Sequence, residues 1–332
     1  MVKIRKRKLR KRAKILFSII FLCISLLVVI IFMVTLDKGE PEKPIVNVNK
    51  PSKEVKKPVD NAKKGSIDVL AVGGSDLYSA LTPLQLWNDT GITSYVASER
   101  KQNMCVSYYM VDEIFKYQKP KVLILEMDNF FETRGEDNKE TALKTVYQTC
   151  YPLFKETPLW NQLKDEPYTK RENANMRTLI KGYFYKTDVE PNTEGYDYMG
   201  SHWGEEPIVS YTEKYLPMIM DIASKNNCKV IFICMPSKTS WTYKKHNTVA
   251  KYAEEYNVPF LDMNISDYDS GFDWLTDTRD AGNHLNHNGA MKVTKFLGNY
   301  LKENYDLIDH RGNPNFADWD EDYEYYLSLT KK

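Results

Sequence analysis

Short apolar runs alternate with amphipathic segments along most of this chain of 332 residues. Four runs made almost wholly of Val, Ile, Leu, Phe and similar side chains are expected to be buried strands, at 67–73, 121–127, 229–235 and 258–264. The run 92–98 is a candidate for a fifth strand. Near-continuous apolar runs of this length are typical of a parallel sheet that is covered on both faces.

Between these runs, apolar side chains recur at helical spacing and therefore lie on one face of a helix. The three clearest stripes are Met104, Tyr108, Val111 and Phe115; Tyr215, Ile219, Ile222 and Ala223; and Val293, Phe296, Leu297, Tyr300 and Leu301. Strands that alternate with helices predict an α/β layer fold. We place this domain at 67–310, followed by a C-terminal tail at 311–332.

Residues 130–210 interrupt the alternation and are expected to be an insertion in the domain. This stretch is rich in Tyr and Trp and shows no strand pattern. Two interpretations remain open: a subdomain that covers the sheet edge, or a lid over an active site.

The N-terminal part of the chain has a different pattern. Residues 1–14 carry nine Lys and Arg side chains and no acidic one, and residues 15–36 carry no charge. An apolar helix of ~20 residues spans a bilayer, and its basic flank stays in the cytoplasm. We therefore predict a cytoplasmic tail at 1–14, a single transmembrane helix at 15–36 and a domain outside the cytoplasm. Residues 37–66, rich in Lys, Pro and Glu, are expected to be a disordered linker.

Charge and composition narrow the function classes. The net charge is only +1, so the basic tail leaves the rest of the chain net acidic, and binding to nucleic acid is not favoured. An apolar segment longer than a signal-peptide core, with no small-residue cleavage site, favours a retained anchor in the cell membrane. Hydrophobic residues, counted with all 23 tyrosines, make up 42% of the chain, which is ample for a globular core.

Four cysteines lie beyond the apolar N-terminal segment: Cys105, Cys150, Cys228 and Cys234. Cys228 and Cys234 flank one expected strand and would be roughly 20 Å apart, beyond the reach of a disulfide. We expect buried thiols, although a disulfide through Cys105 or Cys150 remains open. Because no metal-ligand spacing, dinucleotide motif or phosphate-binding loop occurs, we expect neither a metal nor a cofactor.

The first expected strand ends on Gly73 and Gly74, and Ser75 follows directly. Ligands of open α/β sheets bind at the carboxyl ends of strands. Glycines permit a sharp turn there and leave room beside the serine. A serine becomes a nucleophile only when a base takes its proton.

The candidate base is His284, which precedes a helix expected to begin near Gly289. Asp280 lies four residues before it and Asp277 is also close; a carboxylate on the imidazole would fix its tautomer and stabilise its charged form. His287 is expected to be a solvated loop histidine. Trp241 and His246 follow the end of another strand and are candidates to line the same cleft.

These segments resemble a known superfamily. "VGGSDLYSAL" and "HLNHNGA", with Gly289 five residues after His284, are similar to the first and last sequence blocks of the SGNH/GDSL hydrolases. "YQKPKVLILEMDNFFE" and "YNVPFLDMN" are similar to the subgroup that accompanies membrane-bound O-acyltransferases, which includes the teichoic acid D-alanine-transfer protein and alginate-acetylation-type proteins. The resemblance implies a flavodoxin-like three-layer sandwich. It also implies Ser75 as nucleophile, His284 as base and Asp280 as the acid.

The chain departs from the superfamily pattern at two points. The usual Asp-x-x-His has one residue fewer than Asp280 to His284, so the acid could be Asp280 or Asp277, or a dyad could suffice. The central Gly-x-Asn-Asp has no clear copy. By the resemblance, Asn129 is the candidate side-chain donor to an oxyanion, Gln102 is a weaker one, and the Ser75 N–H is a third.

The leading functional hypothesis is a membrane-anchored extracytoplasmic serine esterase or O-acyltransferase. It would act on a cell-surface polysaccharide or a teichoic-acid-like polymer through an acyl-serine, with a membrane-bound O-acyltransferase as partner. The alternative is a non-catalytic scaffold or polymer-binding subunit with the same fold. A glycosidase using Glu126 and Asp128 as paired carboxylates is a third, weaker hypothesis.

Overall fold

The computed structural model describes residues 63–134, 137–150, 153, 177, 179–265 and 270–330. The expected cytoplasmic tail, transmembrane helix and nearly all of the linker fall in residues 1–62, outside the described residues. Within the described ranges, no helix has both the length and the apolar character needed to cross a bilayer.

A five-stranded parallel sheet forms the centre of the domain. Its strands are β1 (Val69–Gly73), β2 (Ser94–Ser98), β3 (Val122–Glu126), β4 (Lys229–Cys234) and β5 (Phe260–Asp262), in the spatial order β2-β1-β3-β4-β5. All four neighbouring pairs are parallel. All five expected strands and the central parallel sheet are confirmed, and the order is that of flavodoxin-like folds.

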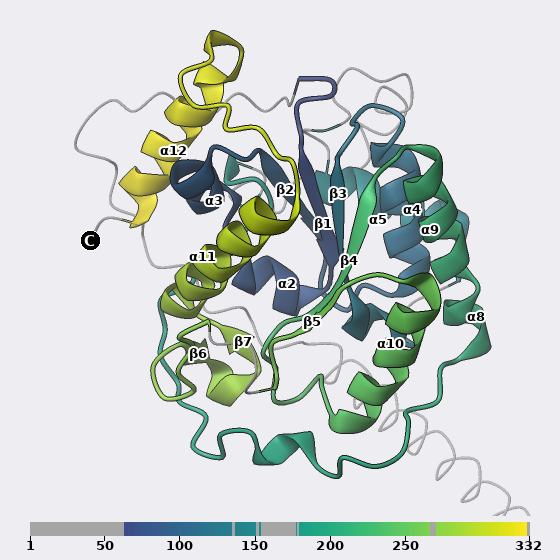
Figure 1. The fold of residues 1–332 in the computed structure, drawn as a ribbon. Helices are drawn as coiled ribbons and strands as arrows, with labels where there is room; N and C mark the ends of the chain where they lie inside the picture. The colour runs from purple at the N-terminus through teal and green to yellow at the C-terminus, as the bar shows by residue number, and fades with distance from the viewer. Residues whose placement is uncertain are drawn as a thin grey trace, which may run out of the picture. The chain divides into compact units, whose positions relative to one another are not determined.

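Helices cover both faces of this sheet (Figure 1). On one face lie α2 (Ser75–Ala80), α3 (Pro83–Thr90) and α11 (His287–Asn304); on the other lie α4 (Met104–Ile114), α5 (Lys139–Cys150), α9 (Tyr215–Lys225) and α10 (Tyr243–Tyr256). The short helix α8 (Ser210–Glu213) precedes α9. The three apolar stripes found in the sequence belong to α4, α9 and α11, as expected, because each stripe is the face that packs inward.

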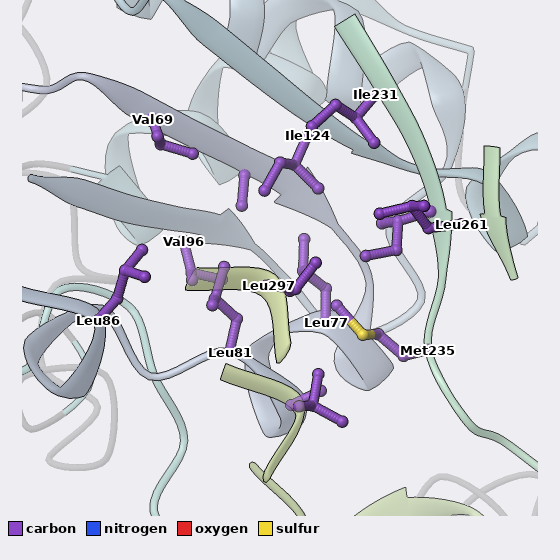
Figure 2. Packing of buried hydrophobic residues seen from close by; sticks show 14 of the residues in the cluster. Val69, Leu77, Leu81, Leu86, Val96, Ile124, Ile231, Met235, Leu261 and Leu297 are labelled. Carbon is purple, nitrogen blue, oxygen red and sulfur yellow. The ribbon is translucent and has the colours of Figure 1, made fainter. Parts of the chain in front are cut away.

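The hydrophobic core beneath α2, α3 and α11 fixes the position of α2, the helix that follows β1 (Figure 2). Leu77 of α2 and Leu81, directly after α2, pack with Leu297 of α11 against the sheet, and all three are fully buried. Truncating a buried Leu to Ala costs about 2–5 kcal/mol. The helix that begins at Ser75 is therefore fixed by its packing.

The segment that we expected to be a C-terminal tail forms a helix, α12 (Ala317–Thr330), after a short turn η6 (Pro314–Phe316). Trp319 packs on Trp87 of α3 with ring centroids 5.5 Å apart. The Trp87 indole N–H donates to Asp320 at 3.0 Å. Residues 317–330 therefore extend the domain beyond the expected boundary at 310, because the aromatic pair buries both rings.

One smaller expectation, the linker boundary, changes, and the expectation of buried thiols is confirmed. Residues 63–66, assigned to the linker, are hydrogen-bonded to the domain: the Gly65 N–H donates to the Tyr117 carbonyl at 3.0 Å. The cysteines Cys105, Cys150, Cys228 and Cys234 are all unpaired and buried, so the disulfide left open above is not formed. Burial raises the pKa of the Cys228 thiol to about 12, which makes it a poor nucleophile.

Candidate active site

A cleft of about 520 Å³ opens at the carboxyl ends of the strands. Ser75 follows β1, Asp128 follows β3, Ser240 follows β4, and His284 lies in a small hairpin far along the chain; all four line this cleft. Its other lining residues are Arg100, Lys101, Phe131, Glu132, Thr133, Arg134, Thr239, Lys245 and Asn283. The fold therefore brings the two leading sequence candidates, Ser75 and His284, to one cavity. The described start of the expected insertion, at Phe131–Arg134, forms one wall.

Gly73 and Gly74 provide space rather than an unusual backbone conformation. Neither has a positive φ, and Gly74 is extended at φ −95°. A Cβ at Gly73 would lie 2.5 Å from Glu126 Oε2, and the Gly74 N–H donates to the same oxygen at 2.6 Å. The turn before Ser75 is therefore held by the buried Glu126, which fits only because Gly73 has no side chain.

Replacing Gly73 by alanine is expected to destabilise the fold by about 1–3 kcal/mol and to disturb the Ser75 turn. The new Cβ would also lie 2.6 Å from Leu77 Cδ2. Thermal unfolding of Gly73→Ala and Gly74→Ala tests this. At Gly74 the nearest atom would be Asn129 Oδ1 at 3.2 Å, so that variant should be milder. Equal melting temperatures for Gly73→Ala and wild type would contradict the packing argument.

His284 is held in a two-stranded hairpin, β6 (Thr278–Arg279) and β7 (His284–Leu285), joined by the turn η5 (Asp280–Gly282). Asp280 Oδ1 accepts the His284 backbone N–H at 2.8 Å, and Asp280 Oδ2 lies 2.7 Å from His284 Nδ1. Asp280 and Ala281 have positive φ values of 52° and 56°. This left-handed turn accommodates the extra residue between Asp280 and His284, at a cost of order 1 kcal/mol or more for each residue.

Asp277 does not contact the imidazole. Its Oδ2 accepts from Lys292 Nζ at 2.6 Å and from the Asp273 N–H at 2.8 Å. Of the two carboxylates that the sequence left open, the geometry therefore places Asp280 on His284.

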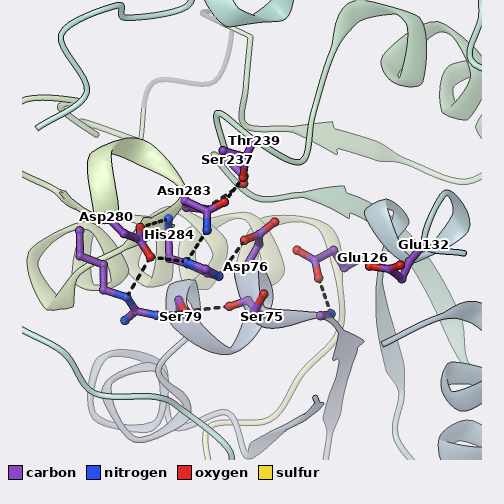
Figure 3. A network of polar contacts seen from close by, with 12 residues as sticks. Ser75, Asp76, Ser79, Glu126, Glu132, Ser237, Thr239, Asp280, Asn283 and His284 are labelled. Carbon is purple, nitrogen blue, oxygen red and sulfur yellow. Dashed lines mark hydrogen bonds and ion pairs between the residues drawn. The ribbon is translucent and has the colours of Figure 1, made fainter. Parts of the chain in front are cut away.

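A carboxylate that sequence reasoning missed lies on the other side of the imidazole (Figure 3). Asp76 Oδ1 is 3.6 Å from His284 Nε2, and burial raises the pKa of Asp76 to about 6, against the attraction of His284. The signal was present in the sequence, because an acid directly after the candidate nucleophile must lie near the same site.

Two further acids are buried near this position. Burial, and then the charge of Asp76, raise the pKa of Glu126 well above its ordinary value. Burial also raises the pKa of Asp128, although Lys245 Nζ lies 2.9 Å from it and opposes the shift. Glu126 is 1% exposed and does not line the cleft. The geometry therefore gives no support to a glycosidase pair of Glu126 and Asp128.

The two side chains expected to donate to an oxyanion, Asn129 and Gln102, both donate to the hydroxyl of Ser107 instead. Asn129 Nδ2 donates to Ser107 Oγ at 2.9 Å, and Gln102 Nε2 donates to the same oxygen at 3.1 Å. Both amides are 2% exposed, and neither is among the residues that line the cleft. Asn129 nevertheless adjoins Gly74, the residue before Ser75.

Three expectations about other aromatic residues are wrong. Trp241 and His246 do not line the cleft, because both bind Asp262 Oδ2, each at 2.7 Å. His287 is not a solvated loop residue: it begins α11, its Nδ1 lies 3.1 Å from the Tyr183 hydroxyl, and burial lowers its pKa to about 4.

Strand order and site together describe an α/β domain with a serine, a histidine and an aspartate at the carboxyl edge of a parallel sheet. Among the described residues, no three His, Cys, Asp or Glu side chains are grouped to hold a metal ion.

Comparison with known proteins finds similar solved structures only. No family model matches the sequence, and no curated protein matches it. The similar structures include the esterase EstA from Pseudoalteromonas sp. (10% identity, 71% of this chain and 97% of that one, TM-score 0.38). A GDSL-like lipase from Bacteroides thetaiotaomicron has 10% identity over 71% of this chain and 87% of its own, with TM-score 0.34. An acetyl xylan esterase, Est2A, from Butyrivibrio proteoclasticus has 12% identity over 73% and 65%, with TM-score 0.32. At these values the likeness adds nothing to the geometry above.

Proposed function

We propose that this protein is a serine acyl-esterase or O-acyltransferase of the SGNH type. The observation that carries the proposal is the placement of His284: Asp280 holds its Nδ1 at 2.7 Å, and its ring lines the same cleft as Ser75. A carboxylate on Nδ1 leaves Nε2 as the basic nitrogen, which is the arrangement that activates a serine hydroxyl.

The reaction would proceed in two acyl transfers. Ser75 Oγ attacks the ester carbonyl carbon while its proton passes to His284 Nε2, and the carbonyl electrons move onto oxygen. Collapse of this oxyanion expels the alcohol, which takes the proton back from His284, and leaves an acyl-serine. Water, or a hydroxyl of an acceptor, then attacks the acyl carbon by the same proton path and frees Ser75. Asp280 stabilises the imidazolium in both halves.

The oxyanion would be stabilised by Asn129, by Gln102 and by the Ser75 N–H. One such donor is worth roughly 3–4 kcal/mol in the barrier. Asn129 lies nearer to Ser75, but the atom beside Gly74 is its acceptor Oδ1, and its Nδ2 donates to Ser107 Oγ. Gln102 contacts the same Ser107 hydroxyl from further along the chain and is the weaker candidate.

The charge of the cleft supports a polar or anionic acyl acceptor. Four cationic side chains line it, Arg100, Lys101, Arg134 and Lys245, against the two acidic ones Asp128 and Glu132. Lys245 pairs with Asp128 and Arg134 with Glu132. Within the described part of the chain, Arg100 and Lys101 have no acidic partner at this cleft. A cell-surface polysaccharide or teichoic-acid-like polymer is the acceptor that we propose.

The membrane assignments rest on the sequence. We propose that residues 15–36 anchor the protein in the cell membrane, with the N-terminus in the cytoplasm and the domain outside. A membrane-bound O-acyltransferase is the proposed partner, because the resemblance described above is to the subgroup that accompanies such enzymes.

A non-catalytic scaffold remains the alternative, and one observation favours it. No hydrogen bond joins Ser75 Oγ to His284 among the described residues, and His284 Nε2 lies near Asp76 instead. Catalytic hydrogen bonds are often long in unliganded enzymes and tighten only with substrate, so the esterase or transferase hypothesis is preferred.

A fluorophosphonate probe on the full-length chain tests the proposal, because such probes phosphonylate only activated serines. We expect labelling of wild type and loss of labelling in Ser75→Ala. Ser240→Ala, which removes another serine of the same cleft, should still be labelled. An unlabelled wild type with a cooperative thermal transition would favour the scaffold.

A further inference from the structure

The imidazole of His284 lies between two carboxylates that differ in exposure (Figure 3). Asp280 is on the Nδ1 side at 2.7 Å, and its side chain is 44% exposed. Asp76 is on the Nε2 side at 3.6 Å, and its side chain is 7% exposed. Water screens the first pair, whereas the second interacts through a medium of much lower dielectric constant. Asp76 is therefore placed to influence the imidazole strongly despite its longer distance.

One oxygen of Asp76 lacks a hydrogen bond. Asp76 Oδ1 is buried and has no hydrogen-bond partner in the described part of the chain. The nearby Ser237 hydroxyl, which follows β4, donates to the Asn283 carbonyl at 2.9 Å instead. A buried acceptor without a donor is costly, and the nearest ring nitrogen to Oδ1 is His284 Nε2. A proton on that nitrogen would satisfy it.

We propose that Asp76 is a second positioning carboxylate for His284, facing Nε2 and setting how strongly that nitrogen holds a proton. The proposal rests on the function proposed above, in which Nε2 exchanges a proton with Ser75. In the resting protein Nε2 carries no proton, and Asp76 Oδ1 lies beside it without a hydrogen bond. During catalysis, it stabilises the imidazolium that carries the serine proton. Asp76 is not among the residues that line the cleft, so it is a positioning residue.

Other charged groups around Asp76 affect its ionisation. The negative charge of Asp128, after β3, raises the pKa of Asp76. Asp76 in turn raises the pKa of Glu126, at the end of β3. Lys245 of α10 offsets Asp128. On the hairpin, Arg279 Nε lies 3.9 Å from Asp280 and reduces the pull of Asp280 on His284. Burial raises the pKa of Asp76 to about 6, against the attraction of His284.

Histidine NMR on the full-length chain tests this directly. With ¹³C-labelled histidine, the resonance of His284 is identified by its loss in His284→Gln, and its pKa is read from a pH titration. In Asp76→Asn the pKa of His284 should fall by about one unit or more, because an opposite charge within 4–6 Å has been removed. An unchanged pKa would overturn the proposal.

Two further variants separate charge from structure. Asp76→Glu keeps the charge and should restore most of the wild-type pKa. Asp277→Asn removes a buried carboxylate that binds Lys292 instead of His284, and it should leave the pKa of His284 unchanged. If Asp76→Asn does not fold, the pH titration of wild type decides: the chemical shift of His284 should change in two coupled steps, and a single step would overturn the proposal.

Failure of the proposed role of Asp76 and failure of the proposed enzymatic function give different results in these experiments. A fall in the pKa of His284 without fluorophosphonate labelling of wild type would retain Asp76 as a partner of the imidazole and remove the catalytic role. Labelling of wild type with no effect of Asp76→Asn on the pKa would keep the enzyme and remove the proposed role of Asp76.

Discussion

Replacing His284 by alanine is expected to lower kcat for an acetyl ester such as p-nitrophenyl acetate by about a thousandfold or more. Without the imidazole, which Asp280 orients, the Ser75 hydroxyl loses the proposed acceptor for its proton. Steady-state kinetics on purified full-length protein measures the loss. A variant that retained more than about a tenth of the wild-type kcat would contradict the assignment of His284 as the base.

His246 offers a matched control for this experiment. Its Nδ1 also lies 2.7 Å from an aspartate, Asp262, but its ring is outside the cleft. His246→Gln should therefore change kcat by only a small factor, even if it lowers the melting temperature. An equal loss of kcat in both variants would show that disturbance of the fold, rather than loss of the base, explains the effect at His284.

Replacing Asp280 by asparagine is expected to lower kcat by about 10- to 1000-fold. In a serine triad this change costs about 10⁴-fold, because the amide favours the wrong imidazole tautomer. The smaller estimate reflects the 44% exposure of the Asp280 side chain, since water screens its charge and can replace part of its hydrogen bonding. The substrate KM should change little, because Asp280 does not line the cleft.

Asp277→Asn separates the two acids that the sequence could not distinguish. Asp277 is buried and binds Lys292 Nζ at 2.6 Å, so its loss should reduce stability by about 1–3 kcal/mol while kcat is retained. Urea unfolding and steady-state kinetics on both variants check this. The reverse result, with kcat lost in Asp277→Asn and kept in Asp280→Asn, would contradict the proposal that Asp280 is the acid that supports His284.

The sequence predicted the sheet well and the surroundings of the site less well. Every expected strand is present, because near-continuous runs of Val, Ile and Leu are typical of strands in a parallel sheet that is covered on both faces. Ser75 and His284 were found because their flanking residues carry a local signal. Trp241, His246 and His287 were misplaced because each is held by a distant residue, such as Asp262 or Tyr183, and no local pattern reports that contact.

The apolar pattern determined the α/β class and the strand positions, and the two glycines before Ser75 indicated the candidate nucleophile at the end of β1. Burial of apolar surface and the chemistry of a strand end are both local properties of the sequence. Only the tertiary structure decided which acid holds His284 and that Asp76 faces its other nitrogen. Those contacts depend on the left-handed turn at Asp280 and on the packing of the hairpin against α2. They join segments far apart in the chain, whose approach is set by the whole fold.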